Sequence, residues 1–424
     1  MNDIDILVIG LTVILFACVS DVARNGRFTA PMMFAGIGLL LGPMILNVVR
    51  IPMQDETVKR VAELTLVVAL FTDSVRINVK RLRRFHSLPI RLLGIGLPLT
   101  MVLGTFAAWW IFPSFGLWEA AVLAVMLGPT DAALGEPVVT SEEVPALVRQ
   151  GLNVESGMND GLGLPCLFIV ASLAGAGTTA GAGDWTAYIL LQILGGPVIG
   201  ATIATVAAWA IARPLRRGWV GEDFFRLALF ALPVVAYLAA DMLQANGFLA
   251  AFAAGVVVST RSEYTRDAVE EFAGTIGQLL NSTIFFLVGA LLLPQFLHHI
   301  GWQHVVFALL ALTVLRMGPV AMAVIGMGLH RRTTLFLGWY GPRGMASVIY
   351  LLIVLDTFDI AAIDDIAATV ALTVLASIVL HGLTAAPGSR RYGQFARKLR
   401  SSDAENAPVP VQRVPGELCA KERA

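Results

Sequence analysis

Residues 120–139 read AAVLAVMLGPTDAALGEPVV, and residues 146–171 read ALVRQGLNVESGMNDGLGLPCLFIVA. Both stretches are apolar, yet the first carries Asp131 and the second carries Asp160. A carboxylate is costly inside a bilayer, so its presence there indicates a functional pathway with partners. The Gly-Pro pair at 128–129 can break a membrane helix and expose backbone groups around a midplane site. The hairpin predicts a secondary transporter that binds a small cation at Asp131 and Asp160.

The composition is that of a polytopic membrane protein. The 424 residues are 57% hydrophobic and 14% charged, whereas soluble domains are about a quarter charged. The formal net charge is zero, which argues against nucleic acid as a partner. Cys18, Cys166 and Cys419 are scattered and form neither a metal motif nor a disulfide framework. We expect no cofactor, and the first apolar run, 6–19, is predicted as a retained helix, not a cleaved signal peptide.

The chain contains about thirteen segments long and apolar enough to be spanning helices, each of which needs roughly 20 residues. The sequence therefore predicts an all-α polytopic membrane protein. Residues 387–424 are polar and include PVPVQRVPGE, which predicts a disordered cytoplasmic tail. The predicted helices are 4–21, 29–49, 58–75, 88–112, 117–137, 145–175, 186–213, 222–243, 246–260, 271–295, 300–329, 332–355 and 362–386.

Lysine and arginine gather in the odd-numbered loops and at the start of the tail. The even-numbered loops are nearly free of them, apart from Arg50, Lys59 and Arg60. Because cytoplasmic loops carry the excess of positive charge, we expect the N-terminus outside and the C-terminus in the cytoplasm, in the plasma (inner) membrane. The basic residues are Arg76, Lys80, Arg81, Arg83, Arg84, Arg213, Arg216, Arg217, Arg261, Arg266, Arg331, Arg332, Arg390, Arg391, Arg397, Lys398 and Arg400.

Two Gly-Pro interruptions occupy matching places. LGPTD (127–131) lies in the fifth predicted helix and YGPRG (340–344) in the twelfth. Each is second from last in a group of six helices, and the two groups begin on opposite sides of the membrane. This pattern predicts two inverted six-helix repeats, with the binding site where the two broken helices cross. The alternative is that Gly-Pro kinks are simply common in membrane helices.

The sixth helix presents two pairs of polar residues, each pair four residues apart and so on one face. Ser156 and Asp160 offer oxygen ligands for a small monovalent cation or a proton. Glu155 and Asn159, rotated by about 100°, form a brace that needs a positive partner. Arg343 is the obvious candidate, because a guanidinium can bind Glu155 in a fork while holding the Asn159 amide. The alternatives are a solvated Glu155 near a helix end and an Arg343 that extends to the membrane interface.

Three further charges lie in or near apolar sequence. Asp131 and the freed carbonyl of Thr130 can complete a cation site, although Asp131 can also act as a helix cap. Asp73 either lines the approach to the site or caps the third helix, and the cap is slightly favoured. Arg316 is expected to be a structural charge paired with an acid or with freed carbonyls. Because a proton and a cation compete for the same oxygens, such a site can exchange one for the other.

At these motifs the sequence resembles a known family. LGPTDAAL (127–134) followed by NVESGMNDGLGLP (153–165) resembles the core hairpin of sodium/proton exchangers, within the monovalent cation–proton antiporter superfamily. GPRG at 341–344 is similar to the family's twelfth helix, which carries an arginine. The resemblance implies thirteen helices, a homodimer, and Na+ (or K+ or Li+) bound by Asp160, Asp131, Ser156 and the Thr130 backbone. It implies a brace made of Glu155, Asn159 and Arg343.

The resemblance also implies a division into domains and a stoichiometry. The pair Asn159-Asp160 resembles the electroneutral branch of the superfamily, which implies one cation per proton. Family members often carry a glutamate on the third helix, where this chain has Thr72-Asp73, so Asp73 is a candidate accessory residue. The implied domains are 1–87 and 219–297 for dimerisation, 88–176 and 298–386 for the transport core, 177–218 for a linking helix, and 387–424 for the tail.

The predicted function is exchange of Na+ for H+ by alternating access, which is transport and not enzymatic catalysis. The alternatives are a K+/H+ antiporter of the same fold and a channel-like or regulatory membrane protein. A channel needs a repeated carbonyl filter, which the sequence does not show. A membrane hydrolase is disfavoured because the only histidine in the same half of the chain as Ser156 is His86, in a basic loop.

Overall fold

The chain, in this computed structural model, consists of helices joined by loops, without a strand, in the residues that it describes, namely 3–25, 28–49, 56–76, 87–175, 190–260, 263–400 and 402–406. The helices are α1 (Asp3–Asn25), α2 (Ala30–Leu41), α3 (Glu56–Arg76), α5 (Ser87–Arg91), α6 (Leu97–Ile111), α7 (Leu117–Met126), α8 (Ala132–Val139), α9 (Ala146–Gly175), α11 (Gly196–Arg216), α12 (Glu222–Met242), α13 (Gly247–Ser259), α14 (Glu263–Leu287), α15 (Leu293–Phe296), α16 (Trp302–Leu312), α17 (Val314–Ala323), α18 (Arg331–Trp339), α19 (Met345–Thr357) and α20 (Ile363–Ala396).

Seven helices within those ranges are long and apolar enough to cross a membrane. Each of the thirteen predicted segments contains a helix or a broken helix, so the prediction of an all-helical membrane protein is confirmed. The number of crossings stays a prediction, because α2 and α13, with 12 and 13 residues, are shorter than a straight span requires. The seven are Leu88–Ile111, Ala146–Gly175, Leu191–Leu215, Glu222–Met242, Ile276–His299, Trp302–Ala323 and Ile363–Ala396.

Proline sets where three of the long helices widen. The π-helical segments Leu92–Gly96, Leu191–Gly195 and Val288–Leu292 each end two residues before a proline. A proline ring lacks an N–H and clashes with the carbonyl four residues earlier, which in each case lies inside the π-helical segment. A local π-helical turn absorbs that mismatch without ending the helix.

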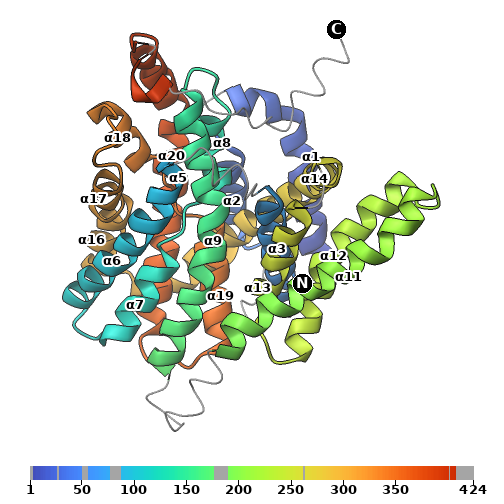
Figure 1. The fold of residues 1–424 in the computed structure, drawn as a ribbon. Coiled ribbons are helices and arrows are strands. Elements are labelled where there is room, and N and C mark those ends of the chain that lie inside the picture. The colour runs from blue at the N-terminus through green and yellow to red at the C-terminus, as the bar shows by residue number, and fades with distance from the viewer. Residues whose placement is uncertain are drawn as a thin grey trace.

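The helices pack in two groups. One contains α3, α11, α12 and α13, in which α13 packs against each of the other three. The other contains α6, α7, α9, α16, α17, α18 and α20. Figure 1 shows α16, α17 and α18 on one side of the molecule, α11 and α12 on the other, and α9 between them. Of the first group, α3, α12 and α13 lie in the predicted dimerisation domain and α11 in the predicted link, and this division stays a prediction.

Two broken helices cross, as predicted. The fifth predicted helix is divided into α7 and α8 by residues 127–131, and the twelfth is divided into α18 and α19 by residues 340–344. The Asp131 N–H donates to the Pro342 carbonyl at 2.8 Å, so the two interruptions touch through their backbones.

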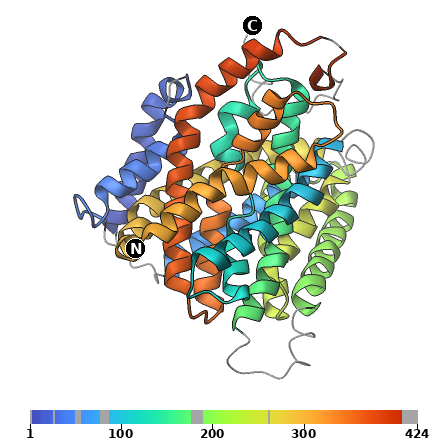
Figure 2. The same cartoon turned by 90° about the vertical axis from the view of Figure 1, so that its left-hand side faces the viewer.

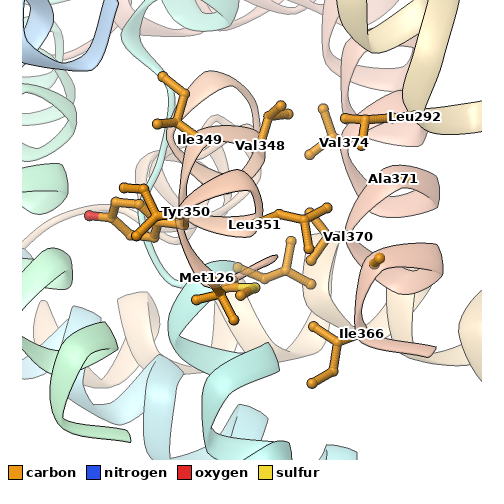
Figure 3. Close-up of a cluster of buried hydrophobic side chains, with 14 of the residues drawn as sticks. Met126, Leu292, Val348, Ile349, Tyr350, Leu351, Ile366, Val370, Ala371 and Val374 are labelled. Atoms are coloured by element: carbon orange, nitrogen blue, oxygen red, sulfur yellow. The ribbon is translucent and has the colours of Figure 1, made fainter. Parts of the chain in front are cut away.

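Apolar packing fixes α19 beyond its break. Val348 and Leu351 face Val370 and Val374 of α20, while Tyr350 lies on the opposite side of α19 (Figure 3). These side chains are at most 2% exposed. The half-helix is thus held on its apolar side by α20, which leaves the other side to contact the polar residues of α9.

The expected disordered tail does not begin at residue 387. Helix α20 continues through Pro387 to Ala396, and Figure 2 shows it, in red, as one long helix. The Tyr392 ring stacks on Phe336 with 4.1 Å between centroids, and Glu405 is 1% exposed. The prediction was wrong for the described residues up to 406 because their apolar contacts come from distant sequence. Residues 407–424 lie outside the described residues.

Candidate functional site

Asp131 caps two helices at once. Its Oδ1 accepts hydrogen bonds from the N–H groups of Ala133, at 2.7 Å, and Leu134, at 3.4 Å, at the start of α8. Its Oδ2 accepts one from the Met345 N–H, at 2.6 Å, at the start of α19. A carboxylate is favourable at a helix N-terminus, so one buried side chain satisfies both half-helices. The capping role, one of the two alternatives left open by the sequence, is what the structure shows.

Glycine is required next to that carboxylate. A Cβ at Gly344 would overlap the Asp131 carboxylate. The missing side chain therefore lets the backbone of one break approach the acid of the other.

Arg343 makes the complementary contact. Its Nη1 donates to the Gly128 carbonyl and, at 2.8 Å, to the Pro129 carbonyl. These carbonyls are freed where α7 ends, and a cation is favourable at a helix C-terminus. Arg343 is fully buried. Each break therefore supplies the charge that stabilises a helix end of the other.

The predicted pairing of Glu155 with Arg343 is wrong. Glu155 instead forms a forked ion pair with Arg316 of α17, with Nη1–Oε1 at 2.5 Å and Nη2–Oε2 at 2.8 Å. Both residues are 1% exposed. The guanidinium of Arg316 lies directly against Gly341, where a Cβ would overlap it. Arg343 is occupied by the freed carbonyls, and a buried carboxylate needs a partner, which Arg316 provides.

Asn159 is held by the first break and not by Arg343. Its Nδ2 donates to Thr130 Oγ1 at 2.6 Å, and that hydroxyl lies 3.0 Å from Ser156 Oγ. All three residues are buried. The predicted contact of Asn159 with Arg343 is therefore wrong. Asn159 instead connects α9 to Thr130 in the break, where the hydroxyl oxygens of Thr130 and Ser156 lie side by side.

Asp160 carries an unsatisfied oxygen in the site, as Asn159 does at its Oδ1. It is 6% exposed, and its Oδ1 has no hydrogen-bond partner among the described residues. Its backbone carbonyl accepts a hydrogen bond from the Tyr350 hydroxyl of α19. Asp73 and Asp131 are the carboxylates that act on it electrostatically. A buried charged oxygen without a donor is unfavourable unless it holds a proton or a cation, and this is the chemistry that exchange requires.

Asp73 reaches the same helix from α3. It is half-buried, and its side chain lies against Gly157, one turn before Gly161 on α9. On the other side of that turn the Phe252 ring of α13 lies against Gly161. The structure thus brings Asp73 close to Asp160, while its accessory role stays a prediction.

The donor set suits a monovalent cation better than a transition metal. Within the ranges described, no group of three or more His, Cys, Asp or Glu side chains is placed to hold a metal ion. The oxygens that gather near Asp160 are instead the hydroxyls of Ser156 and Thr130 and the carboxylates already named. Hard oxygen ligands are those that such cations prefer.

Sequence reasoning did not identify three polar residues around the breaks. Tyr350, Ser377 and His381 are each at most 1% exposed and bond to the site helices. Only a weak signal marks them, since each is a polar residue inside an apolar run. Arg316 was recognised as a structural charge, and its position before Gly318-Pro319 was the available signal.

Comparison with known families gives one extensive match. Residues 10–390 match the family described as "Sodium/hydrogen exchanger, transmembrane".

Curated relatives are more distant in sequence. A probable Na+/H+ antiporter of Schizosaccharomyces pombe is 26% identical over 358 residues, which are 80% of this chain and 47% of the relative. The Na+/H+ antiporter NhaP of Pseudomonas aeruginosa is 26% identical over 352 residues, 76% of this chain and 78% of the relative. The K+/H+ antiporter NhaP of Alkalimonas amylolytica is 24% identical over 357 residues, 83% and 61% respectively. The chain spans less than half the length of the S. pombe relative and of the Na+/H+ antiporter of Saccharomyces cerevisiae, of which it covers 47% and 36%.

A solved structure shares the fold. The sodium proton antiporter MjNhaP1 of Methanocaldococcus jannaschii superimposes with a TM-score of 0.74 at 19% identity, covering 93% of this chain and 98% of that one. The arrangement of helices in this chain is therefore that of a known transporter fold.

Proposed function

Because the chain belongs to the sodium/hydrogen exchanger family, we propose that it exchanges Na+ for H+ across a membrane by alternating access. One observation carries the proposal: the buried Oδ1 of Asp160 has no donor and lies beside two crossed helix breaks. The names of several relatives, among them two Na+/H+ antiporters, support the same exchange.

Asp160 is the group that we assign to the exchange itself. It holds either a cation or a proton, and the hydroxyl oxygens of Ser156 and Thr130 complete the cation's surroundings. Asp131 holds both half-helix ends through three amides and adds negative charge. Asp73 on α3 lines the approach. The cation and the proton exclude each other because both need the same Asp160 oxygen.

The exchange is proposed to be electroneutral. Asn159 occupies the position beside Asp160 and cannot titrate, and Glu155 is held in a forked pair with Arg316. Asp160 is then the one carboxylate that alternates between cation and proton. One proton is therefore carried back for each cation transported, and no net charge crosses the membrane.

The movement is proposed to occur between the two groups of helices. Residues 88–176 and 298–386 form the moving core, residues 1–87 and 219–297 the dimerisation domain of a homodimer, and residues 177–218 the link. The packing of α12, α13 and α14 on α3 supports the grouping of residues 1–87 with residues 219–297. The distribution of basic loops supports a plasma-membrane orientation with the N-terminus outside and the C-terminus in the cytoplasm.

The test is transport by the purified full-length protein in proteoliposomes that report internal pH with a quenched dye. LiCl, NaCl and KCl are added in turn, and we expect NaCl to restore the fluorescence. Recovery of fluorescence with KCl and not with NaCl would support the K+/H+ alternative, which the name of the A. amylolytica relative favours. Silence with all three salts, in vesicles shown to contain folded protein, contradicts the proposed function.

A further inference from the structure

One face of α20 holds the second helix break from the side opposite the cation site. Ser377, His381 and Thr384 lie on this face, spaced by four and three residues. Each bonds to the segment 339–343, in which α18 ends and the break begins. Ser377 is fully buried and His381 is 1% exposed, so water does not compete for their hydrogen bonds.

These contacts form a continuous relay. The Arg343 N–H donates to Ser377 Oγ at 2.7 Å. Ser377 Oγ lies 3.1 Å from His381 Nδ1, and His381 Nε2 lies 3.0 Å from the Trp339 carbonyl. His381 Nδ1 also lies 3.1 Å from the Ser377 carbonyl, so each ring nitrogen faces a carbonyl and the hydrogen of a neutral imidazole can lie on either one. The Ser377 hydroxyl, which accepts from the Arg343 N–H, bonds to Nδ1 in either tautomer: it donates to an unprotonated Nδ1 or accepts from a protonated one.

The relay ends at the cation site. Arg343 is the residue whose guanidinium binds the Gly128 and Pro129 carbonyls. The two residues that follow those carbonyls in the chain are Thr130 and Asp131. The backbone position of Arg343 therefore determines how far its guanidinium reaches into the first break.

We propose that His381 is a positioning residue of the cation site, which acts through the Ser377 hydroxyl on the backbone of Arg343. This inference rests on the proposed exchange function. It assigns no proton transfer to His381, whose two nitrogens are both engaged inside the relay. It predicts that the link from Nδ1 to Ser377 matters for cation binding and that the link from Nε2 to Trp339 matters less.

Two substitutions separate the two links. In His381→Asn the side-chain amide can occupy the place of Nδ1 and still bond to Ser377, whereas in His381→Gln it occupies the place of Nε2 and contacts only Trp339. Ser377→Ala removes the relay at its centre. Thr384→Val is the matched control, because it removes the bond from Trp339 Nε1 on the same face of α20 and leaves the contacts of Arg343, Ser377 and the His381 ring in place.

The first readout is the dependence of exchange on cation concentration in proteoliposomes. Loss of a group that orients a ligand-bearing segment lowers affinity by about tenfold or more. We expect that rise in the apparent KM in Ser377→Ala and His381→Gln, with a smaller change in maximal rate. His381→Asn and Thr384→Val should retain the unsubstituted KM. Equal losses in His381→Asn and His381→Gln, or a KM rise in Thr384→Val, would show that the histidine only fills space and would overturn the inference.

The second readout does not depend on transport. Hydrogen–deuterium exchange of peptides covering 339–345 reports the Arg343 N–H, which Ser377 protects in the structure. We expect faster exchange in Ser377→Ala and His381→Gln and unchanged exchange in His381→Asn and Thr384→Val. If none of the three salts drives transport by the unsubstituted protein, the proposed function fails. The hydrogen–deuterium exchange rates still decide whether His381 acts on Arg343 through Ser377. Unchanged protection in both Ser377→Ala and His381→Gln overturns it.

Discussion

Asp131 and Arg343 each stabilise a helix end created by the other residue's break. The carboxylate from the first break accepts from the N–H of Met345, at the start of α19. The guanidinium from the second break donates to the carbonyls of Gly128 and Pro129, at the end of α7. Each break therefore provides a charged side chain to a helix end of the other break. These contacts satisfy the backbone hydrogen-bonding groups at the half-helix ends, where lipid offers no partner.

Asp160→Asn is expected to abolish exchange while leaving the fold intact. Asparagine has the same shape but cannot alternate between a proton and a cation, and the substitution removes an unpartnered charge from the interior. The measurement is dye dequenching in proteoliposomes, together with thermal unfolding in detergent. Asp241→Asn, on the exposed surface of α12, is the control and should transport normally. Substantial sodium-driven proton movement by Asp160→Asn would rule out Asp160 as the carrier.

Glu155 and Arg316 are expected to be strongly coupled in stability. Removing one partner of a buried ion pair leaves an uncompensated charge, at about 3–5 kcal/mol. Glu155→Gln and Arg316→Ala should each lower the unfolding temperature, and the double variant should lose less than the sum. The control cycle combines Glu155→Gln with Arg343→Ala, for which we expect weaker coupling. Stronger coupling to Arg343 than to Arg316 would contradict the observed pairing.

Asp131→Asn is expected to destabilise the protein, unlike Asp160→Asn. An asparagine oxygen can accept one or two of the three amide hydrogen bonds, but the charge at two helix N-termini is lost. Each such interaction contributes about 0.3–1 kcal/mol, and up to about 2 kcal/mol when partly buried. Thermal unfolding of the two variants side by side provides the measurement. If Asp131→Asn unfolds at the same temperature as the unsubstituted protein, the carboxylate does not act as a double cap.

Gly344→Ala is expected to impair both stability and exchange. The added methyl group would overlap the Asp131 carboxylate and force the two breaks apart. Gly135→Ala is the matched control, because nothing lies within 4 Å of a Cβ there, and alanine is favoured over glycine in a helix by about 1 kcal/mol. The comparison uses unfolding temperature and transport rate. Normal behaviour of Gly344→Ala would show that the breaks tolerate separation.

The end point of exchange is expected to be independent of the membrane potential. Moving one net charge would couple transport to voltage at about 2.3 kcal/mol per 100 mV. In proteoliposomes with a potassium gradient and valinomycin, the sodium-driven pH change should reach the same end point at every imposed potential. If K+ is itself a substrate, a different ionophore couple replaces valinomycin. An end point that shifts with voltage would indicate a second proton carrier, such as Asp73.

The sequence predicted the parts of the site that depend on local chemistry. Gly-Pro pairs mark the breaks because proline cannot continue the helical hydrogen bonds, and Asp131 beside such a break is a natural cap. The choice between Arg316 and Arg343 as the partner of Glu155 could not be predicted. Both arginines lie in apolar segments far along the chain, and only the packing of α17 under Gly341 decides which one reaches the acid.

The same limit applies to the end of the chain. Residues after 386 are polar in sequence, but Tyr392 finds its apolar partner in Phe336, and Glu405 accepts from the N–H of His330 at 2.8 Å. Local composition cannot indicate burial that is provided by residues about fifty or more positions away. Helix continuation beyond Pro387 was therefore missed, while the all-helical architecture, which follows from apolar segment length, was predicted correctly.

The double cap at Asp131 has a consequence for how the two repeats can change over time. A carboxylate encoded in the first repeat completes a helix that is encoded in the second, so neither repeat carries all the groups needed to end its own helices. A chain cut between the two repeats would yield two fragments that fold correctly only when they are produced together. A substitution in the break of one repeat must remain compatible with the break of the other, so the two repeats are expected to evolve together.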